Sequence, residues 1–147
     1  MIEFSDDYFM RKAYAEAEEA FLLDEVPIGA VVVLENQIIG KGHNLTQRLN
    51  DVTAHAEMQA LTAASLYLGA KYLKNCTLYV TLEPCIMCAG AIAWAQVGRL
   101  VYGAADTKKG YSLIKTPILH HKTEVKNGVL SNQCTQILID FFAKKRK

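Results

Sequence analysis

The sequence contains no apolar run long enough to cross a membrane and no segment of biased composition. Of its 147 residues, 51% are hydrophobic and 21% are charged. The longest apolar runs, such as residues 28–34, fall far short of the roughly 20 residues that a membrane helix needs. This composition excludes disorder, collagen and coiled coil as descriptions of the whole chain.

A secretory signal is also missing from the start of the sequence, where such a signal would be basic and then apolar. The first residues include Glu3, Asp6 and Asp7 instead. We therefore expect a cytoplasmic protein with no membrane partner. The length is that of one domain, so we predict a single domain over residues 1–147.

Cysteine is scarce, and its few positions are informative. Four cysteines are too few for a disulfide scaffold, and two of them, Cys85 and Cys88, form a C-x-x-C motif. In a reducing compartment, this spacing indicates either a metal site or a redox dithiol. The other two, Cys76 and Cys134, are typical of small buried apolar residues.

The net charge of +1 conceals an uneven distribution. Residues 1–100 carry 7 Lys and Arg against 12 Asp and Glu, whereas residues 101–147 carry 9 against 3. The last third, which ends in a basic run over residues 144–147, is compatible with contacts to a polyanion such as nucleic acid. From charge alone, a solvated helical tail is the more common explanation.

Hydrophobic periodicity and turn residues predict alternating helices and strands. Ser5 is the expected N-cap of the first helix and Thr53 that of the second. Helices interleaved with strands imply a sheet covered on both faces, with parallel pairing where a helix joins successive strands. The predicted helices cover residues 6–23, 54–68, 89–96 and 131–144, and the predicted strands cover residues 28–34, 38–43, 76–81, 99–103 and 122–126.

Two predicted helix starts bring together ligands that a metal ion prefers. One carries His55, and the other carries Cys85 and Cys88, which lie on the same side of a helical turn. Two thiolates and an imidazole are common Zn²⁺ ligands, and three protein ligands leave a fourth position open, as in catalytic zinc sites.

Glu57 suggests a use for that fourth position. Residues two apart on a helix point in roughly opposite directions, so Glu57 is better placed as a base than as a ligand beside His55. Zinc lowers the pKa of bound water to about 7, and a nearby carboxylate can move the proton to a leaving group. This chemistry is hydrolysis.

Alternatives remain open at this point. A redox pair would leave His55 and Glu57 without a role. A closed structural zinc site would need a fourth ligand, which Cys76, Cys134, His43, His120 or His121 could supply.

The combination of H-x-E at residues 55–57 with P-C-x-x-C at residues 84–88 resembles the signature of zinc-dependent nucleobase deaminases. The runs over residues 25–31, 53–58 and 77–90 closely resemble the bacterial tRNA adenosine deaminases, and the likeness extends over nearly the whole chain. The resemblance implies a cytidine-deaminase-like α/β/α sandwich of three layers with a five-stranded mixed sheet, in a homodimer. It also implies conversion of adenosine to inosine at the wobble position of a tRNA anticodon stem-loop.

The resemblance further assigns site residues. His55, Cys85 and Cys88 would hold one Zn²⁺ per subunit, and Glu57 would move protons while ammonia leaves C6 of adenine. Four further positions match residues that contact the substrate in the family, although each also has an ordinary structural explanation as a turn, core or loop residue. They are Asn44, Ile28, Leu82 and Asp106.

One region departs from the family. After Asp106 the family usually continues with a Gly-rich stretch and a longer loop, whereas residues 107–123 are shorter here. Tyr111, beside Lys108 and Lys109, could stack on a base or pack against a partner subunit.

Three functions are compatible with these residues. The leading hypothesis is a zinc hydrolase acting on adenosine in tRNA. A second is a deaminase of free guanine, cytosine or a small nucleoside. A third, from another class, is a non-catalytic zinc-stabilised subunit that binds RNA or a partner, against which Glu57 argues.

Overall fold

A computed structural model describes residues 2–146, so Lys147 of the basic run lies outside the described residues. Four α-helices and five strands alternate broadly as the periodicity predicts. The helices are α1 (Asp6–Leu22), α2 (Ala56–Leu68), α3 (Ile86–Ala95) and α4 (Ser131–Lys145). The strands are β1 (Gly29–Leu34), β2 (Gln37–His43), β3 (Thr77–Leu82), β4 (Arg99–Ala104) and β5 (Glu124–Lys126), with a 3₁₀ turn η1 (Tyr111–Leu113) before β5.

The five strands form one mixed sheet in the order β2-β1-β3-β4-β5. Strand β1 pairs antiparallel with both β2 and β3, and β1 and β2 form a hairpin from the strands predicted over residues 28–34 and 38–43. Strands β3, β4 and β5 run parallel, and α3 joins β3 to β4 as a parallel pair requires. The end of β2, the start of β1 and the ends of β3 and β4 therefore lie side by side, at the same end of the strands.

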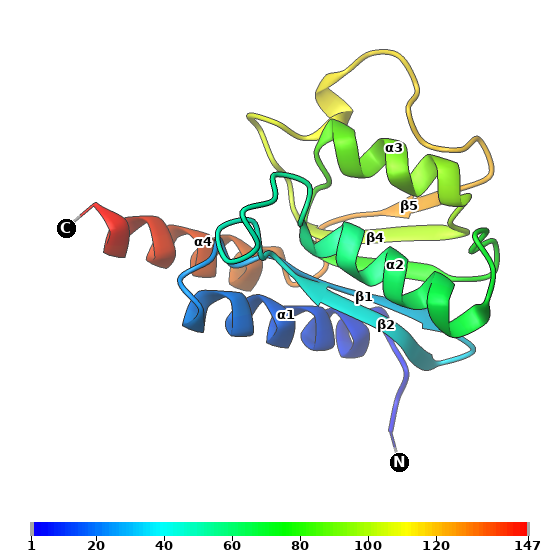
Figure 1. Ribbon diagram of the computed structural model, residues 1–147, viewed down its shortest axis with the longest axis horizontal. Helices are drawn as coiled ribbons and strands as arrows, with labels where there is room; N and C mark the ends of the chain where they lie inside the picture. The colour runs from blue at the N-terminus through cyan, green and yellow to red at the C-terminus, as the bar shows by residue number, and fades with distance from the viewer. Residues whose placement is uncertain (1, 147) are drawn as a thin grey trace.

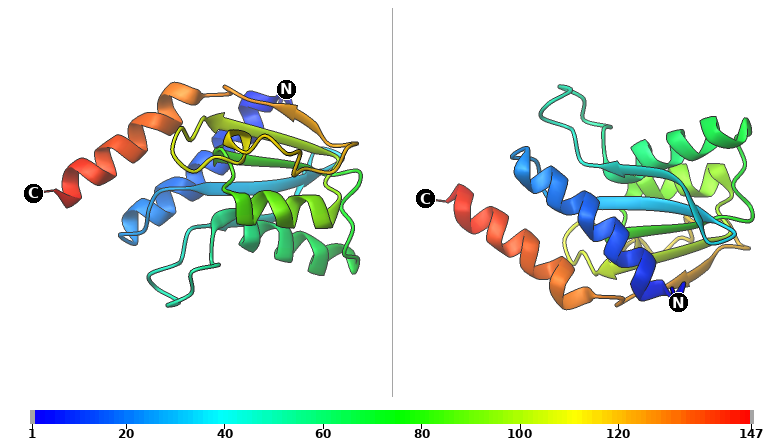
Figure 2. Two further views of the ribbon diagram at one scale, coloured as in Figure 1. Left: turned by 90° about the horizontal axis from the view of Figure 1, so that it is seen from above. Right: turned by 90° about the horizontal axis from the view of Figure 1, so that it is seen from below.

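Helices cover both faces of this sheet, which confirms the predicted three-layer sandwich. Along β1, Ala30 and Val32 belong to the core under α2 and α3, whereas Val31 and Val33 belong to the core under α1 and α4. This alternation is the period of two that a strand buried on both faces produces. Figures 1 and 2 show α1 and α4 on one face and α2 and α3 on the other.

Helix α2 packs so close to strand β2 that two positions of the strand have room only for glycine. A side chain at Gly40 or Gly42 would collide with the backbone of α2, so only glycine allows this approach. The stripe that faces the sheet therefore consists mainly of small residues, and Leu68 is exposed. Its buried residues are Ala56, Glu57, Ala60, Leu61 and Ala64.

The starts of α2 and α3 also differ from the prediction, and the shift matters for the site. Helix α2 begins at Ala56 with His55 at the N-cap, while Thr53 bonds Asp51 instead of capping the helix. Helix α3 begins at Ile86, three residues before the predicted start, with Cys85 at its N-cap. His55 and Cys85 thus each occupy an N-cap position.

Helix α1 is fastened to the sheet at its first turn. Ser5 caps the helix as predicted, accepting a hydrogen bond from the Tyr8 amide at 3.1 Å. Asp6 accepts two hydrogen bonds from the Arg99 guanidinium, at 2.7 and 2.8 Å. The Arg99 guanidinium holds the pKa of the Asp6 carboxyl well below its ordinary value. Within residues 2–146, none of the helices combines the length and hydropathy that a membrane crossing requires.

Candidate metal centre and substrate cavity

The predicted metal ligands converge. The Nδ1 atom of His55 lies 3.7 Å from Sγ of Cys85 and 3.5 Å from Sγ of Cys88. The three ligand atoms all lie within 4.8 Å of one another. Ligands held about 2.0–2.3 Å from a tetrahedral ion are separated from each other by roughly 3.5–3.8 Å. These three residues, called the metal group below, are therefore spaced to hold one metal ion.

The electrostatics of the metal group favour a cation. Hydrogen bonds from Cys88 and His55 lower the pKa of Cys85 to about 3, so its thiolate forms readily. Contact with Cys85, together with burial, raises the pKa of the Cys88 thiol, because two thiolates side by side repel each other. A metal ion between the two sulfurs would remove that repulsion.

Among residues 2–146, no fourth His, Cys, Asp or Glu side chain joins the metal group. Cys76 lies in the core under α2 and α3, and Cys134 lies in the core under α1 and α4. His43 contacts Glu16 at 3.0 Å. The closed structural site considered from the sequence is therefore not what these residues form.

Glu57 lies in the first turn of α2 and is 4% exposed. Burial raises the pKa of its carboxyl to about 7, while the neighbouring His55 opposes this shift. A carboxyl that changes its protonation near neutral pH can both accept and donate a proton. Glu57 lies outside the metal group, yet it lines the same cavity as His55 and Cys85.

A cavity of about 720 Å³ opens over the metal group. Its volume is within the range of sites for small-molecule ligands. All four predicted contact residues, Asn44, Ile28, Leu82 and Asp106, line it together with His55, Glu57 and Cys85. Cys88 is fully buried beneath them.

Asn44 combines a structural contact with a place in the cavity wall. Its side-chain Oδ1 accepts a hydrogen bond from the Thr46 amide at 3.2 Å, which is the turn that the residue type predicts. The backbone N–H of Asn44 donates a hydrogen bond to the Ile28 carbonyl at 3.1 Å. The bond to Thr46 thereby fixes the side chain at the cavity.

Asp106 is likewise a turn residue that lines the cavity. Its Oδ1 accepts hydrogen bonds from the Lys108 and Lys109 amides, both at 3.0 Å. These bonds shape the start of the β4–β5 loop, which covers residues 105–123. Lys108 and Lys109 line the cavity beside Asp106.

Sequence reasoning missed the wall that α4 contributes. Leu138, Ile139 and Phe142 line the cavity, and Ile139 and Phe142 are exposed. The sequence does indicate this wall, because α4 carries a second set of apolar residues beside the stripe that packs on the sheet. That stripe consists of Cys134, Ile137 and Phe141.

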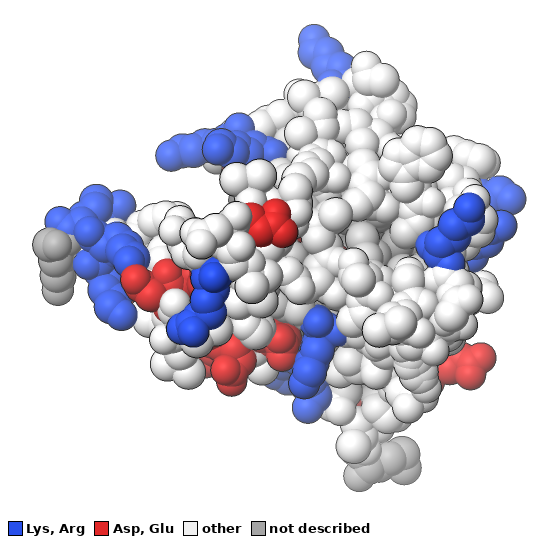
Figure 3. All heavy atoms as spheres, viewed as in Figure 1, with Lys and Arg blue, Asp and Glu red and all other residues white. Residues whose placement is uncertain are grey.

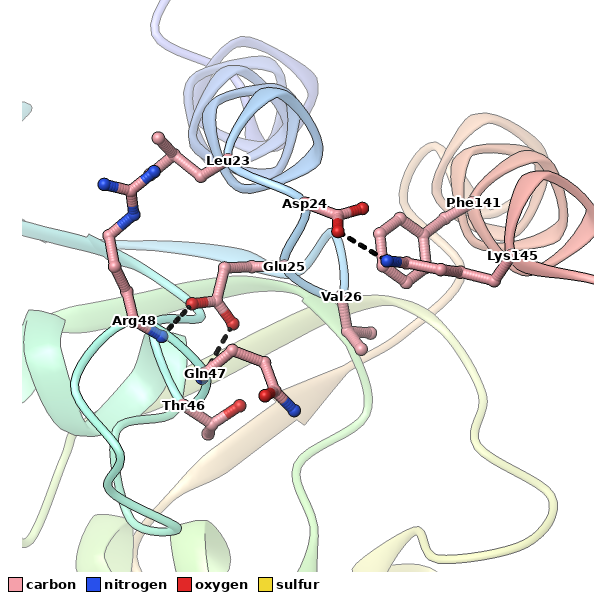
Figure 4. A pocket seen from close by; sticks show the side chains of 9 residues that line it. All are labelled: Leu23, Asp24, Glu25, Val26, Thr46, Gln47, Arg48, Phe141 and Lys145. Carbon is pink, nitrogen blue, oxygen red and sulfur yellow. Dashed lines mark hydrogen bonds and ion pairs between the residues drawn. The ribbon is translucent and has the colours of Figure 1, made fainter.

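Sequence reasoning also missed two buried carboxylates next to the cavity. Glu25 precedes β1 and Glu83 follows β3, and both are almost fully buried. Glu25 lies in a neighbouring cavity of about 400 Å³, which Figure 4 shows between α1, α4 and the loop that carries Gln47 and Arg48. Composition gives no signal for such residues, because an isolated Glu is usually solvated.

Comparison with known proteins agrees with this geometry. The MafB19-like deaminase family matches residues 4–146. A tRNA-specific adenosine deaminase from Agrobacterium fabrum is 45% identical over 144 residues, which is 95% of each chain. The chain belongs to the tRNA-specific adenosine deaminase family. A relative of the same name from Aquifex aeolicus is 41% identical, again over 95% of each chain.

Solved structures place this family member among deaminases. One comes from a study of A-to-I editing by tRNA:A34 deaminases at the wobble position of transfer RNA. It has a TM-score of 0.84 and 45% identity, covering 89% of this chain and 99% of the other. Guanine deaminase from Bacillus subtilis has a TM-score of 0.67 and 32% identity, covering 95% of this chain and 93% of the other.

Proposed function

We propose that the chain is a zinc-dependent hydrolase that converts adenosine to inosine at the wobble position of a tRNA anticodon. One observation carries the proposal: three metal ligands lie beside a buried carboxylate in a single cavity. Relatives that share 45% and 41% identity over 95% of the chain are tRNA-specific adenosine deaminases. Because tRNA is the substrate, we place the protein in the cytoplasm.

Zinc is the metal that suits the ligands. One imidazole and two thiolates are typical Zn²⁺ donors, and the N-cap positions of His55 and Cys85 put the helix dipoles of α2 and α3 behind them. When bound, zinc supplies a water molecule that is acidic enough to lose its proton near neutral pH. His55, Cys85 and Cys88 would hold one Zn²⁺ per subunit.

The remaining site residues bind the base and move protons. Glu57 would accept a proton from the attacking water and donate it to the purine ring, and it would then accept the second proton of the added hydroxyl and donate it to the departing amine. The side-chain amide nitrogen of Asn44 would donate a hydrogen bond to a ring acceptor of the base. Ile28 and Leu82 provide apolar surface for the faces of the ring, and Asp106 contacts the nucleotide at the mouth of the cavity.

Basic residues near the cavity support a nucleic-acid substrate over a free base. Lys108 and Lys109 line the cavity, and Lys144 and Lys145 end the helix that forms its third wall. Figure 3 shows Lys and Arg side chains gathered at the tip of α4. Phosphates of a stem-loop would pair with these groups, whereas a free base has no phosphate.

We also propose that the protein is a homodimer that associates through the face over α2 and α3. Trp94 of α3 is 85% exposed and Leu66 of α2 is 83% exposed. Figure 3 shows that this face carries few charged side chains. Exposed apolar surface of this kind marks a protein interface. Trp94→Glu should convert the dimer to a monomer in analytical ultracentrifugation, and a monomeric wild-type protein would refute this part of the proposal.

Substrate comparison tests the proposed function. Zinc-loaded protein is incubated with an anticodon stem-loop bearing a wobble adenosine, with free guanine, with cytosine and with adenosine. The kcat/KM for inosine formation in the stem-loop should be far higher than the kcat/KM for deamination of any of the free compounds. Deamination of free guanine or cytosine without action on the stem-loop would favour the second hypothesis, and full zinc loading without any activity would favour a non-catalytic subunit.

A further inference from the structure

We propose that Glu83 and Glu25 are a pair of positioning residues that hold opposite walls of the substrate cavity. The inference rests on the proposed function for its kinetic consequence, but its structural part concerns the free protein. Glu83 holds the start of the β4–β5 loop. Glu25 holds the β2–α2 loop, which covers residues 44–55.

Glu83 is 3% exposed and follows the last residue of β3. Its Oε1 accepts a hydrogen bond from the Asp106 amide at 3.0 Å. Its Oε2 accepts two from Ser112, at 3.0 Å from the amide and 2.6 Å from the hydroxyl. A single carboxylate therefore fixes both ends of the segment that places Asp106, Lys108 and Lys109 in the cavity wall.

The same segment rests against the backbone beside the metal group. The Tyr111 amide donates to the Pro84 carbonyl at 2.9 Å, and Gly110 forms an antiparallel bridge with Cys85. A side chain on Gly110 would collide with the Glu83 carboxylate and the Asp106 carbonyl. Glycine at position 110 therefore lets the loop pack closely over Glu83. This packing holds the loop against Cys85, one of the three metal ligands.

Glu25 performs the matching task on the other side. It is 1% exposed, and it accepts hydrogen bonds from the Gln47 amide at 3.0 Å and the Arg48 amide at 2.7 Å. Figure 4 shows both bonds, with the carboxylate pointing from the α1–β1 turn into the β2–α2 loop. The loop segment fixed in this way includes Asn44 and Thr46, which line the catalytic cavity.

Both carboxylates are satisfied chiefly by loop groups. Neither forms an ion pair with a side chain among residues 2–146. Burial of an anion is costly unless strong donors compensate it, and here the donors are amides and one hydroxyl of the two loops. Each loop thus supplies most of the hydrogen bonds that its carboxylate accepts. If the loop moved away, the carboxylate would be left buried without those donors.

Amide hydrogen exchange of the zinc-loaded protein without substrate tests the structural part. In Glu83→Gln, the side-chain NH₂ group takes the place of one carboxylate oxygen. The loop group that donated a hydrogen bond to that oxygen then has no acceptor. Exchange at Asp106 and Ser112 should therefore accelerate by about tenfold or more, while exchange at Gln47 and Arg48 is unchanged. Glu25→Gln should do the reverse. Ser112→Ala removes only the hydroxyl bond and should loosen the same wall as Glu83→Gln to a smaller extent.

Kinetics test the functional part. Each Glu→Gln variant should raise the KM for the stem-loop by roughly tenfold, with a smaller change in kcat and with one zinc per chain retained. Loosening of both loops in either variant, or of neither, would overturn the inference. Loss of zinc from Glu83→Gln would also overturn it, because Glu83 would then act on the metal group instead of the wall. If wild-type protein leaves the stem-loop unmodified, the proposed function fails, while the exchange result still decides the anchoring.

Discussion

The cavity has two parts that are built in different ways: a floor and walls. The floor consists of His55, Glu57, Cys85 and Cys88, which lie at or near the starts of α2 and α3. The walls consist of two loops and one face of α4. The floor is set by short motifs at helix starts, whereas each wall depends on contacts between residues far apart in the sequence. We infer that the floor determines the reaction and that the walls determine the substrate.

The largest effect is expected from breaking the floor itself. Cys88 is fully buried and supplies one of three ligands. Cys88→Ala should abolish both zinc binding and deamination, because two protein ligands seldom retain structural or catalytic zinc. Zinc content by mass spectrometry and inosine formation measure the two losses. A variant that keeps one zinc per chain would show that the metal lies elsewhere.

Glu57→Gln separates the reaction from metal binding within the floor. The amide keeps the shape of the side chain but cannot accept the proton, so the rate should fall by about 10²- to 10⁴-fold. Zinc content should stay at one per chain, because Glu57 lies outside the metal group. Single-turnover kinetics on the stem-loop give the rate. A loss smaller than tenfold would remove Glu57 from its proposed role.

Asn44→Ala probes a wall and should have an intermediate effect. Losing one hydrogen bond to the base should lower kcat/KM by about tenfold, and the zinc content should not change. The same variant also loses the turn bond to the Thr46 amide. Circular dichroism melting therefore accompanies the kinetics. Unchanged kcat/KM for the stem-loop would remove Asn44 from substrate binding.

The basic mouth of the cavity should affect affinity but not chemistry. Replacing Lys108 and Lys109 together by Ala should weaken stem-loop binding and reduce the slope of log affinity against log salt by about 2. Lys12→Ala provides the control, because Lys12 lies on α1 and does not line the cavity. Fluorescence anisotropy across a salt series measures both. Equal slopes for the two variants would contradict phosphate contacts at this wall.

The smallest effect on activity is expected from Asp6→Asn, which lies outside both floor and walls. It should lower the free energy of unfolding by roughly 1–2 kcal/mol at neutral pH through loss of the Arg99 ion pair. The folded protein holds the pKa of Asp6 below the ordinary 3.8, so this stabilisation is present above pH 3.8 and is lost as the pH falls toward the folded pKa. Urea unfolding from pH 7 to pH 3 measures the difference. A constant difference over that range would contradict the ion pair.

The floor can be predicted from the sequence because its residues form two short motifs of recognisable chemistry, although His55 and Cys85 are 30 positions apart. His55 with Glu57, and Cys85 with Cys88, are each within one helical turn, and the preference of metals for such ligands does not depend on distant contacts. The order of helices and strands and the layered sheet follow from periodicity in the same way. Whether the chain is a single domain stays a prediction.

The walls illustrate what a sequence alone does not reveal. Glu83 accepts hydrogen bonds from Ser112, and Glu25 accepts one from Arg48, over 29 and 23 positions. Unlike the residues of the floor, neither pair belongs to a motif that indicates the contact. Helix α2 begins two residues later than predicted, because Thr53 hydrogen-bonds Asp51 instead of capping the helix. For Ile28 and Leu82, only the resemblance to a family indicates a place in the cavity, because a core position would suit either residue equally well.

Zinc titration of metal-free protein tests the central claim most directly. Inosine formation in the anticodon stem-loop should rise in proportion to added zinc and stop rising at one equivalent per chain, with Glu57→Gln binding the same zinc without activity. Full zinc binding by wild-type protein with no inosine in the stem-loop would contradict the account.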